Sequence, residues 1–187
     1  MGAGKSTALQ LLGELGAAVL STDAVVHELY EREELRDAMT ARWGAEVAPA
    51  GMVDRAAIAQ RAFASEEERR WLEETLWPLV GARVAGWLAD VRGQAQATRP
   101  RAAVVEVPLL FEAGMGDLYD ATIAVVSAED VRHGRAGERG HVRVDERAGR
   151  QLAQEEKARR ATFVVRNDGT REDLRRELSA VLDKLAA

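Results

Sequence analysis

The chain opens with Met1-Gly2-Ala3-Gly4-Lys5-Ser6-Thr7, and its Gly-Lys-Ser/Thr core is the closing half of the phosphate-loop motif G-x-x-x-x-G-K-[ST]. Glycines in such a loop let backbone N–H groups turn toward an anion, and the following helix adds free N–H groups and the positive end of its dipole. A lysine reaches the outer phosphates, and a hydroxyl binds the Mg²⁺ between them. The motif predicts a phosphate site formed by Gly2, Ala3, Gly4, Lys5, Ser6 and Thr7.

The motif is not complete in this sequence. Counting back from Gly4, its first glycine would come just before Met1, and the strand that delivers such a loop would precede that glycine. A parallel sheet without this strand would leave helix faces uncovered, so we expect the natural chain to begin earlier, by roughly ten residues. The alternative is that the half-motif occurs by chance at a helix N-terminus of an unrelated fold. The residues that follow decide between a phosphate loop and this chance match.

Composition narrows the class of protein. With 187 residues, the chain fits a single domain with room for a small insertion. No run approaches the roughly 18 apolar residues of a membrane-spanning helix, and the N-terminus does not read as a leader peptide. The absence of cysteine excludes disulfides and thiolate metal sites and is typical of a cytoplasmic protein. A net charge of −5 argues against a nucleic-acid partner, and we expect a monomer or weak oligomer that acts on small molecules.

A helix and a strand follow the loop. Residues 5–15 have the apolar spacing of a helix that ends at Gly16, and residues 17–20 form a short apolar run of the buried-strand type. This order predicts a parallel α/β sheet, in which ligands bind at the carboxyl ends of the strands. Asp23 lies just past a strand end, where it would accept a proton from an attacking hydroxyl or help to hold Mg²⁺. Its alternative role is the N-cap of a helix that begins at Ala24.

The stretch from residue 24 to residue 96 is helical in pattern throughout, which is too long for a simple crossover helix. It predicts a helical subdomain inserted beside the nucleotide site. Pro78 is expected to break the last two helices apart. The predicted helices cover residues 24–32, 34–43, 55–63, 66–76 and 79–91. Four tryptophans are expected to be core anchors rather than stacking platforms, namely Trp43, Trp71, Trp77 and Trp87.

Further strands are expected in the second half of the chain, over residues 102–107, 121–126 and 163–165. Glu106 closes the first of these, in the place of the acid that supports Mg²⁺ in phosphate-loop enzymes. Asn167 follows the last strand and offers an amide that would read an adenine edge, while Asn167-Asp168-Gly169 is also a strong turn signal. A C-terminal helix is predicted over residues 171–185.

Arginines gather between residues 132 and 160, in a region interrupted by glycines. Arg135 and Arg139 are four residues apart and share one face of a predicted helix. Arginine-rich segments that close over the transferring group are what phosphoryl transfer requires. Alternatively, these arginines lie on an exposed helix and pair with glutamates. This alternative suits most of the arginines but suits the spaced pair Arg135 and Arg139 less well.

Together these pieces resemble the dephospho-coenzyme A kinase family over essentially the whole chain. The most distinctive match is Val107-Pro108-Leu109-Leu110-Phe111-Glu112, which resembles the family segment v-P-L-L-f-E. The resemblance also rests on the phosphate loop, Asp23, Arg55 after Gly51-Met52-Val53-Asp54, the pair Arg135 and Arg139, and Asn167-Asp168-Gly169-Thr170. The chain departs from the family pattern at Trp77 in place of His, Arg132 in place of Gln, Thr162 in place of Asp and Glu106 in place of Asp.

The resemblance implies a P-loop kinase fold with three α/β/α layers and a parallel sheet whose first strand is missing from this sequence. The chain would then be one domain, residues 1–187, with a helical acceptor-binding insert over residues 24–96 and an arginine-bearing lid over residues 128–160. Residues 1–23 would hold the phosphate loop and the second strand. The core strands would lie within residues 102–126, and the last strand and C-terminal helix within residues 163–187.

The resemblance also implies an activity, the transfer of the γ-phosphoryl group of ATP to the ribose 3′-hydroxyl of dephospho-coenzyme A in the presence of Mg²⁺. The catalytic residues would be Lys5, Asp23 and Arg135, and the metal would be held by Ser6 and Glu106. ATP would contact the phosphate loop, Arg139 and Asn167. The acceptor would contact Asp23, Arg55, Pro108, Leu109 and Glu112.

Two alternatives stay open. The chain could be another small-acceptor P-loop kinase, of the nucleoside monophosphate or shikimate type, although those enzymes lack the segment 108–112 and the Arg55-centred insert. It could instead be a nucleotide-binding regulator without transfer activity.

Overall fold

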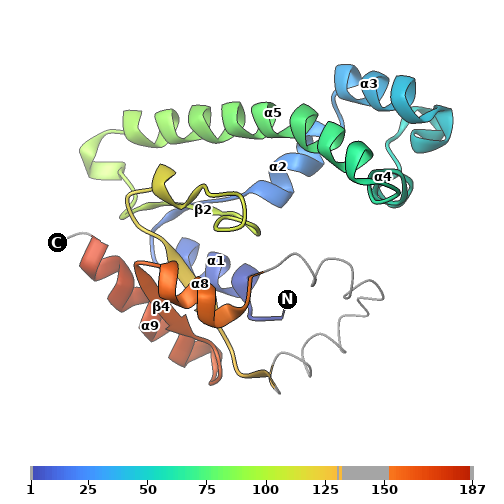
Figure 1. Ribbon diagram of the computed structural model, residues 1–187. Helices are drawn as coiled ribbons and strands as arrows, with labels where there is room; N and C mark the ends of the chain where they lie inside the picture. The colour runs from blue at the N-terminus through green and yellow to red at the C-terminus, as the bar shows by residue number, and fades with distance from the viewer. Residues whose placement is uncertain (1, 130, 132–151, 186–187) are drawn as a thin grey trace. The chain divides into compact units, whose positions relative to one another are not determined.

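The computed structural model describes residues 2–129, 131 and 152–185. The chain forms two compact units, whose elements are shown in Figure 1. The first consists of Met1–Val19 and Gln96–Ala187 and is called the phosphate-loop unit below. The second, Leu20–Ala95, is called the helical unit. Along the chain, strand β1 (Ala18–Ser21) leads from the first unit into the second.

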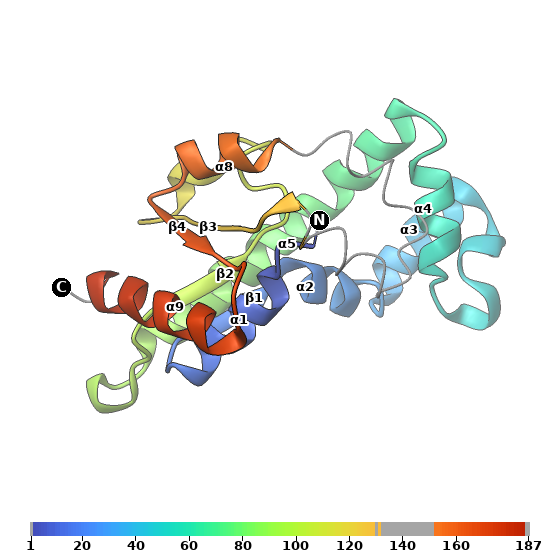
Figure 2. The same cartoon turned by 90° about the horizontal axis from the view of Figure 1, so that it is seen from below.

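The phosphate-loop unit contains both helices and strands. Its longer elements are α1 (Lys5–Glu14), β2 (Ala103–Glu106), β3 (Ile123–Val126), α8 (Gln154–Arg160), β4 (Phe163–Arg166) and α9 (Arg171–Leu185). Two short 3-10 helices are η3 (Gln96–Thr98) and η4 (Gly116–Leu118). Strands β3 and β4 pair in parallel, and this pair lies between α8 and α9 (Figure 2). The predicted α/β class with parallel strands is confirmed.

The described strands form two pairs, β1 with β2 and β3 with β4. In the second pair, Ile123 lies opposite Phe163 and Val126 opposite Arg166. The bonds continue beyond both ends of this pair, because the Phe163 N–H donates to the Thr122 carbonyl and the Asn167 N–H donates to the Val126 carbonyl. The carboxyl ends of β3 and β4 are therefore fixed to each other.

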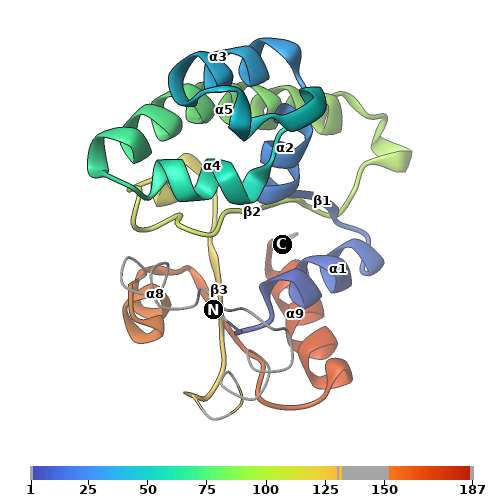
Figure 3. The same ribbon diagram turned by 90° about the vertical axis from the view of Figure 1, so that its right-hand side faces the viewer.

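One apolar core holds the phosphate-loop unit together. Helices α1 and α9 lie side by side and share this core (Figure 3). Burying one leucine of this kind contributes roughly 1.5–3 kcal/mol to folding. The most deeply buried leucines of the core are Leu11, Leu174, Leu178 and Leu182.

Helix α9 begins where the sequence predicted. The Thr170 N–H donates to Asp173 Oδ2 at 3.0 Å, and the Asp173 N–H donates back to Thr170 Oγ1 at 3.2 Å. These reciprocal bonds form a capping box, which satisfies N–H groups that the first turn of a helix leaves unpaired. The prediction of a C-terminal helix over residues 171–185 is confirmed.

The helical unit consists of helices around a second apolar core, with α3 and α4 beside α5 in Figure 3. No described helix is long and apolar enough to cross a membrane. The elements of the helical unit are α2 (Thr22–Leu29), α3 (Glu33–Trp43), η1 (Ala45–Val47), η2 (Pro49–Gly51), α4 (Arg55–Ala62) and α5 (Glu66–Gly93). The most deeply buried side chains of its core are Val25, Leu29, Met39, Val47 and Ile58.

The predicted break at Pro78 is wrong, because α5 continues through it as one helix. A proline inside a helix removes one backbone hydrogen bond and costs about 3 kcal/mol. Apolar side chains on both sides of Pro78 pack against the same core, among them Leu72, Leu76, Leu79 and Val80. We attribute the unbroken helix to this packing, which would be lost if the two halves diverged.

Two of the four tryptophans test the prediction that these side chains are core anchors. Trp43 is buried, its ring meets Trp71 edge to face with centroids 4.9 Å apart, and its Nε1–H donates to Glu68 at 2.6 Å. Trp77 is 56% exposed, so its predicted role as a core anchor is wrong. Trp77 directly precedes the exposed Pro78, on a part of α5 that does not face the core.

Candidate active site

The phosphate loop turns directly into α1. Gly2 and Gly4 have φ angles of 83° and 88°, a region that residues with a Cβ rarely adopt. Gly4 is the N-cap of α1, and its carbonyl accepts the Ala8 N–H at 2.9 Å. No side chain of the described residues caps this helix, so its first N–H groups are left for an anion.

Lys5, Ser6 and Thr7 make up the first turn of α1. Lys5 and Thr7 are half-buried, and Ser6 is exposed. Within the described part of the chain, no carboxylate forms an ion pair with the Lys5 ammonium. The sequence predicted that this turn would follow the loop, and the helix begins at Lys5 as expected.

Asn167 reaches the phosphate loop from the far end of the chain. It follows β4, it is only 6% exposed, and its Nδ2 donates to the Ala3 carbonyl at 2.8 Å. A Cβ atom placed on Gly4 would overlap this amide nitrogen, so the loop and Asn167 are in close contact. The sequence offered Asn167 as a group that reads adenine, and that role stays a prediction.

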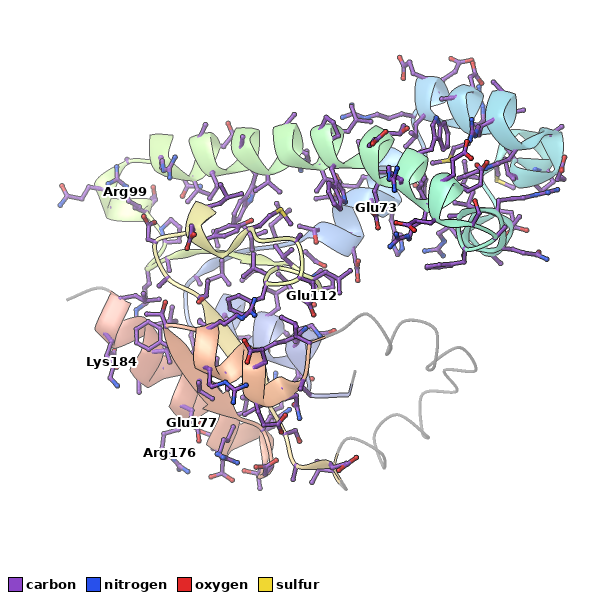
Figure 4. The ribbon with its side chains drawn as sticks, viewed as in Figure 1. Glu73, Arg99, Glu112, Arg176, Glu177 and Lys184 are labelled. Atoms are coloured by element: carbon purple, nitrogen blue, oxygen red, sulfur yellow. The ribbon has the colours of Figure 1, made fainter. Side chains whose placement is uncertain are left out.

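Two acids come from the end of β2 and from the turn that follows it. Glu106 is the last residue of β2 and is half-buried. Glu112 lies on the turn that follows and faces α8 (Figure 4). Its Oε1 accepts the Lys157 ammonium at 2.8 Å and the Leu152 N–H at 2.9 Å. Pro108 and Leu109 belong to the same turn, where the Leu109 carbonyl accepts the Ala113 N–H.

The electrostatics of Glu112 are those of a buried, paired carboxylate. Its side chain is 13% exposed. Burial by itself raises the pKa of Glu112, but the hydrogen bonds from Lys157 and Leu152 and the charge of Lys157 outweigh it and hold the pKa below its usual range. Its second oxygen, Oε2, is buried and has no hydrogen-bond partner among the described residues. A buried carboxylate oxygen in that state is suited to accept a bond from a donor.

A small network ties the end of β3 to α8. The side-chain amide of Gln154 accepts the Ser127 N–H at 3.0 Å through Oε1 and donates to the Ser127 carbonyl at 2.9 Å through Nε2. Sequence reasoning did not find this pair or the partner of Glu112. Ser127 and Gln154 are 27 residues apart, and Glu112 and Lys157 are 45 apart in number, so no local pattern marks either contact.

Two predicted site residues, Asp23 and Arg55, belong to the helical unit. Helix α2 begins at Thr22 with Ser21 as its N-cap, so Asp23 lies in the first turn and is not the N-cap that the alternative proposed. Its carboxylate is exposed. Arg55 is also exposed, and its Nη1 donates to Nε2 of His27 at 2.8 Å. His27 is one turn after Asp23 on α2, a spacing of four that the sequence already contained.

Arg135 and Arg139 lie outside the described residues, together with most of the predicted arginine-rich lid. Their roles stay predictions.

A sequence model of the dephospho-CoA kinase family matches residues 1–173 of the chain. The chain belongs to the dephospho-CoA kinase family. A protein named dephospho-CoA kinase from Rhodopseudomonas palustris (strain HaA2) is 33% identical to it over 189 residues, which cover 100% of this chain and 92% of that protein. Another of that name from Deinococcus radiodurans is 35% identical over 188 residues, 99% of this chain and 88% of that protein.

A solved structure supports the same fold. A crystal structure of a Thermus thermophilus protein superposes with a TM-score of 0.80 at 33% identity, over 100% of this chain and 94% of that one. The resemblance to the dephospho-CoA kinase family, first drawn from the phosphate loop and from residues 107–112, is therefore confirmed.

Proposed function

We propose that this chain transfers the γ-phosphoryl group of ATP to the ribose 3′-hydroxyl of dephospho-CoA, the last step of coenzyme A synthesis. The observation that carries the proposal is membership in the dephospho-CoA kinase family over residues 1–173, with a phosphate loop folded against the start of α1. Relatives that match nearly all of the chain bear the name of that enzyme.

ATP would be held through its phosphates by the loop. The positive φ angles of Gly2 and Gly4 let the loop backbone curve around an anion, and the uncapped start of α1 adds N–H groups and its dipole. The Lys5 ammonium, with no carboxylate partner among the described residues, would neutralise charge on the outer phosphates.

A magnesium ion fits the donors of this unit. Ser6 offers an exposed hydroxyl in the first turn of α1, and Glu106 offers a carboxylate at the end of β2. Mg²⁺ prefers oxygen ligands and usually takes only one or two from the protein, with waters and phosphates as the others. When bound, the ion would offset the charge that develops on the transferring phosphates.

Each acceptor residue predicted from the sequence has a role in this proposal. Asp23 would orient the 3′-hydroxyl and accept its proton, and the Arg55 guanidinium would bind acceptor phosphate. Glu112, whose Oε2 is buried without a partner among the described residues, would accept a hydrogen bond from the acceptor. Pro108 and Leu109, on the same turn, would supply apolar contact. Arg135 and Arg139 would stabilise the charge of the group in transfer.

A coupled assay for ADP release tests the proposal against its alternatives. The chain is mixed with ATP and Mg²⁺ and offered dephospho-CoA, AMP or shikimate as acceptor. We expect ADP release with dephospho-CoA well above the rate without acceptor and no such increase with AMP or shikimate. Preference for AMP or shikimate would favour another small-acceptor kinase. ATP binding without any acceptor-dependent release would favour a nucleotide-binding regulator.

A further inference from the structure

The geometry points to Asn167 as a positioning residue that orients the Ala3–Gly4 peptide of the phosphate loop for triphosphate binding, independently of the base. The inference rests on the proposed function only for the identity of the acceptor. The contact that carries it is the 2.8 Å hydrogen bond from Asn167 Nδ2 to the Ala3 carbonyl, made by a side chain that is 94% buried.

The orientation follows from the planarity of the peptide bond. The carbonyl of Ala3 and the N–H of Gly4 belong to one peptide unit, and in a trans peptide they point in opposite directions. None of the described peptide bonds is cis. Because Asn167 holds the Ala3 carbonyl on its own side of the loop, the Gly4 N–H is turned to the other side. That N–H is one of the groups with which a phosphate loop binds its anion.

The loop needs such a restraint because glycine does not provide one. Gly4 has no Cβ and tolerates both signs of φ, so a peptide that ends at Gly4 can rotate at little steric cost. Its observed φ of 88° is held from outside, by the bond to Ala3 and by the amide of Asn167 packed against Gly4.

Asn167 is itself held rigidly. Its N–H donates to the Val126 carbonyl at 2.8 Å, and its carbonyl accepts the Ser127 hydroxyl at 3.1 Å. The next residue is fixed as well, since Asp168 Oδ1 accepts the Ala128 N–H at 2.5 Å. The position of the amide is therefore set by the β3–β4 pair, and a group on a rigid strand end can hold a loop in one orientation.

The chemistry of this role differs from reading the base. An amide that donates to the loop affects whatever phosphate chain the loop binds, whereas an amide that reads adenine affects only ligands that carry adenine. Inorganic tripolyphosphate separates the two roles, because it has the phosphates of ATP and no base.

The test compares Asn167→Ala and Asn167→Asp with the unchanged chain. We measure kcat and the KM values for ATP and dephospho-CoA, and the inhibition constant of tripolyphosphate competing with ATP. Asn167→Ala should raise the KM for ATP and the inhibition constant of tripolyphosphate by the same factor, about 10-fold, which is the loss of one buried hydrogen bond. Asn167→Asp should raise both further, because a carboxylate would face the Ala3 carbonyl. The KM for dephospho-CoA should change by less than about 2-fold.

Thr122→Val is the matched control. Thr122 is buried at the opposite end of the same strand pair, where its Oγ1 accepts the Thr162 N–H at 3.0 Å. Its loss should lower the melting temperature without changing the inhibition constant of tripolyphosphate. If Thr122→Val raises that constant as much as Asn167→Ala at a similar loss of melting temperature, the role of Asn167 is only structural and the inference is overturned.

Other outcomes are equally decisive. A rise in the KM for ATP with no change for tripolyphosphate would assign Asn167 to the base and overturn the inference, as would no change in either constant. Failure of tripolyphosphate to compete in the unchanged chain would contradict a loop ordered for phosphate. If Asn167→Asp does not fold, Asn167→Ser carries the comparison. Should the chain not act on dephospho-CoA, the proposed function fails, and competition between ATP and tripolyphosphate in a binding assay still tests the inference.

Discussion

The two units hold their predicted site residues in opposite ways. In the phosphate-loop unit, buried groups fix the site, with Asn167 bonded to the loop and Glu112 paired with Lys157. In the helical unit, Asp23 and Arg55 are exposed on helix surfaces, and the Arg55 guanidinium donates a hydrogen bond to His27. We infer that Asn167 and Glu112 are held in place before ligand binds, whereas Asp23 and Arg55 are less restrained by the surrounding protein.

The largest effect should come from the ordered side of this comparison. Lys5→Ala should lower kcat/KM on the order of 10³-fold, the cost of removing one preorganised donor from a transition state, with little change in melting temperature. Steady-state kinetics of ADP release measures it. Lys184→Ala is the control, since Lys184 is an exposed lysine at the end of α9 (Figure 4). Near-normal turnover of Lys5→Ala would show that the loop is not the phosphate site.

Asp23→Asn should have the next largest effect, a fall in kcat on the order of 10²-fold, because an amide keeps the shape of the side chain and cannot accept a proton. The melting temperature should change little, since Asp23 is exposed and is not the N-cap of α2. Glu34→Gln is the control, an exposed acid in the first turn of α3. Unchanged turnover of Asp23→Asn would move the search for a base to Glu106.

Glu112→Gln should reduce the free energy of unfolding by about 1–3 kcal/mol at neutral pH, because a neutral amide weakens the hydrogen bonds from Lys157 and Leu152 and removes the counter-charge of the Lys157 ammonium. Since the pKa of Glu112 is lowered on folding, its contribution is complete above the pKa of an unfolded glutamate and is lost as pH falls through the folded pKa. The difference in free energy of unfolding between the unchanged chain and Glu112→Gln, measured by urea unfolding, should therefore shrink toward acid pH.

Glu156→Gln provides the comparison for Glu112→Gln. Glu156 also binds cations, Arg159 and Arg160, but it does so at the surface of α8. Replacing Glu156 should change the free energy of unfolding much less, because exposed ion pairs contribute little to stability. Equal effects of the two substitutions would mean that burial of Glu112 carries no weight.

The smallest effect is expected at Trp77. Trp77→His should change the free energy of unfolding by no more than about 0.5 kcal/mol, because the side chain is exposed. Trp43→His, in the core of the same unit, should cost at least about 2 kcal/mol. Thermal and urea unfolding of both variants measures the contrast. A large loss of stability for Trp77→His would show that Trp77 supports the core after all.

The sequence predicted best what depends on neighbours along the chain. The loop and the start of α1 at Lys5, and the capped helix α9, follow from local spacing and capping residues. The predicted break at Pro78 was wrong. Proline by itself disfavours a helix interior, but the apolar side chains on both sides of Pro78 pack against one core and keep the helix continuous. The N-cap role of Asp23 was wrong because α2 starts two residues earlier than Ala24, at Thr22.

The contacts that hold the site could not be predicted. Asn167 and Ala3 are 164 residues apart, and only the folded strand pair brings the amide to the loop. Nor does any pattern in the sequence connect Glu112 with Lys157. What the sequence did supply was the identity of these residues, since Asn167 and Glu112 were both singled out, with roles that stay predictions.

The most direct test is the identity of the product formed from ATP and dephospho-CoA. Mass spectrometry and ³¹P NMR of the reaction mixture, with the Lys5→Ala chain as blank, report whether one phosphoryl group was added and at which hydroxyl. We expect a single product, coenzyme A, with the new phosphate on the ribose 3′ oxygen and one ADP formed for each molecule. Phosphate at another position, or ADP released without any phosphorylated acceptor, would contradict the assignment of this chain as a dephospho-CoA kinase.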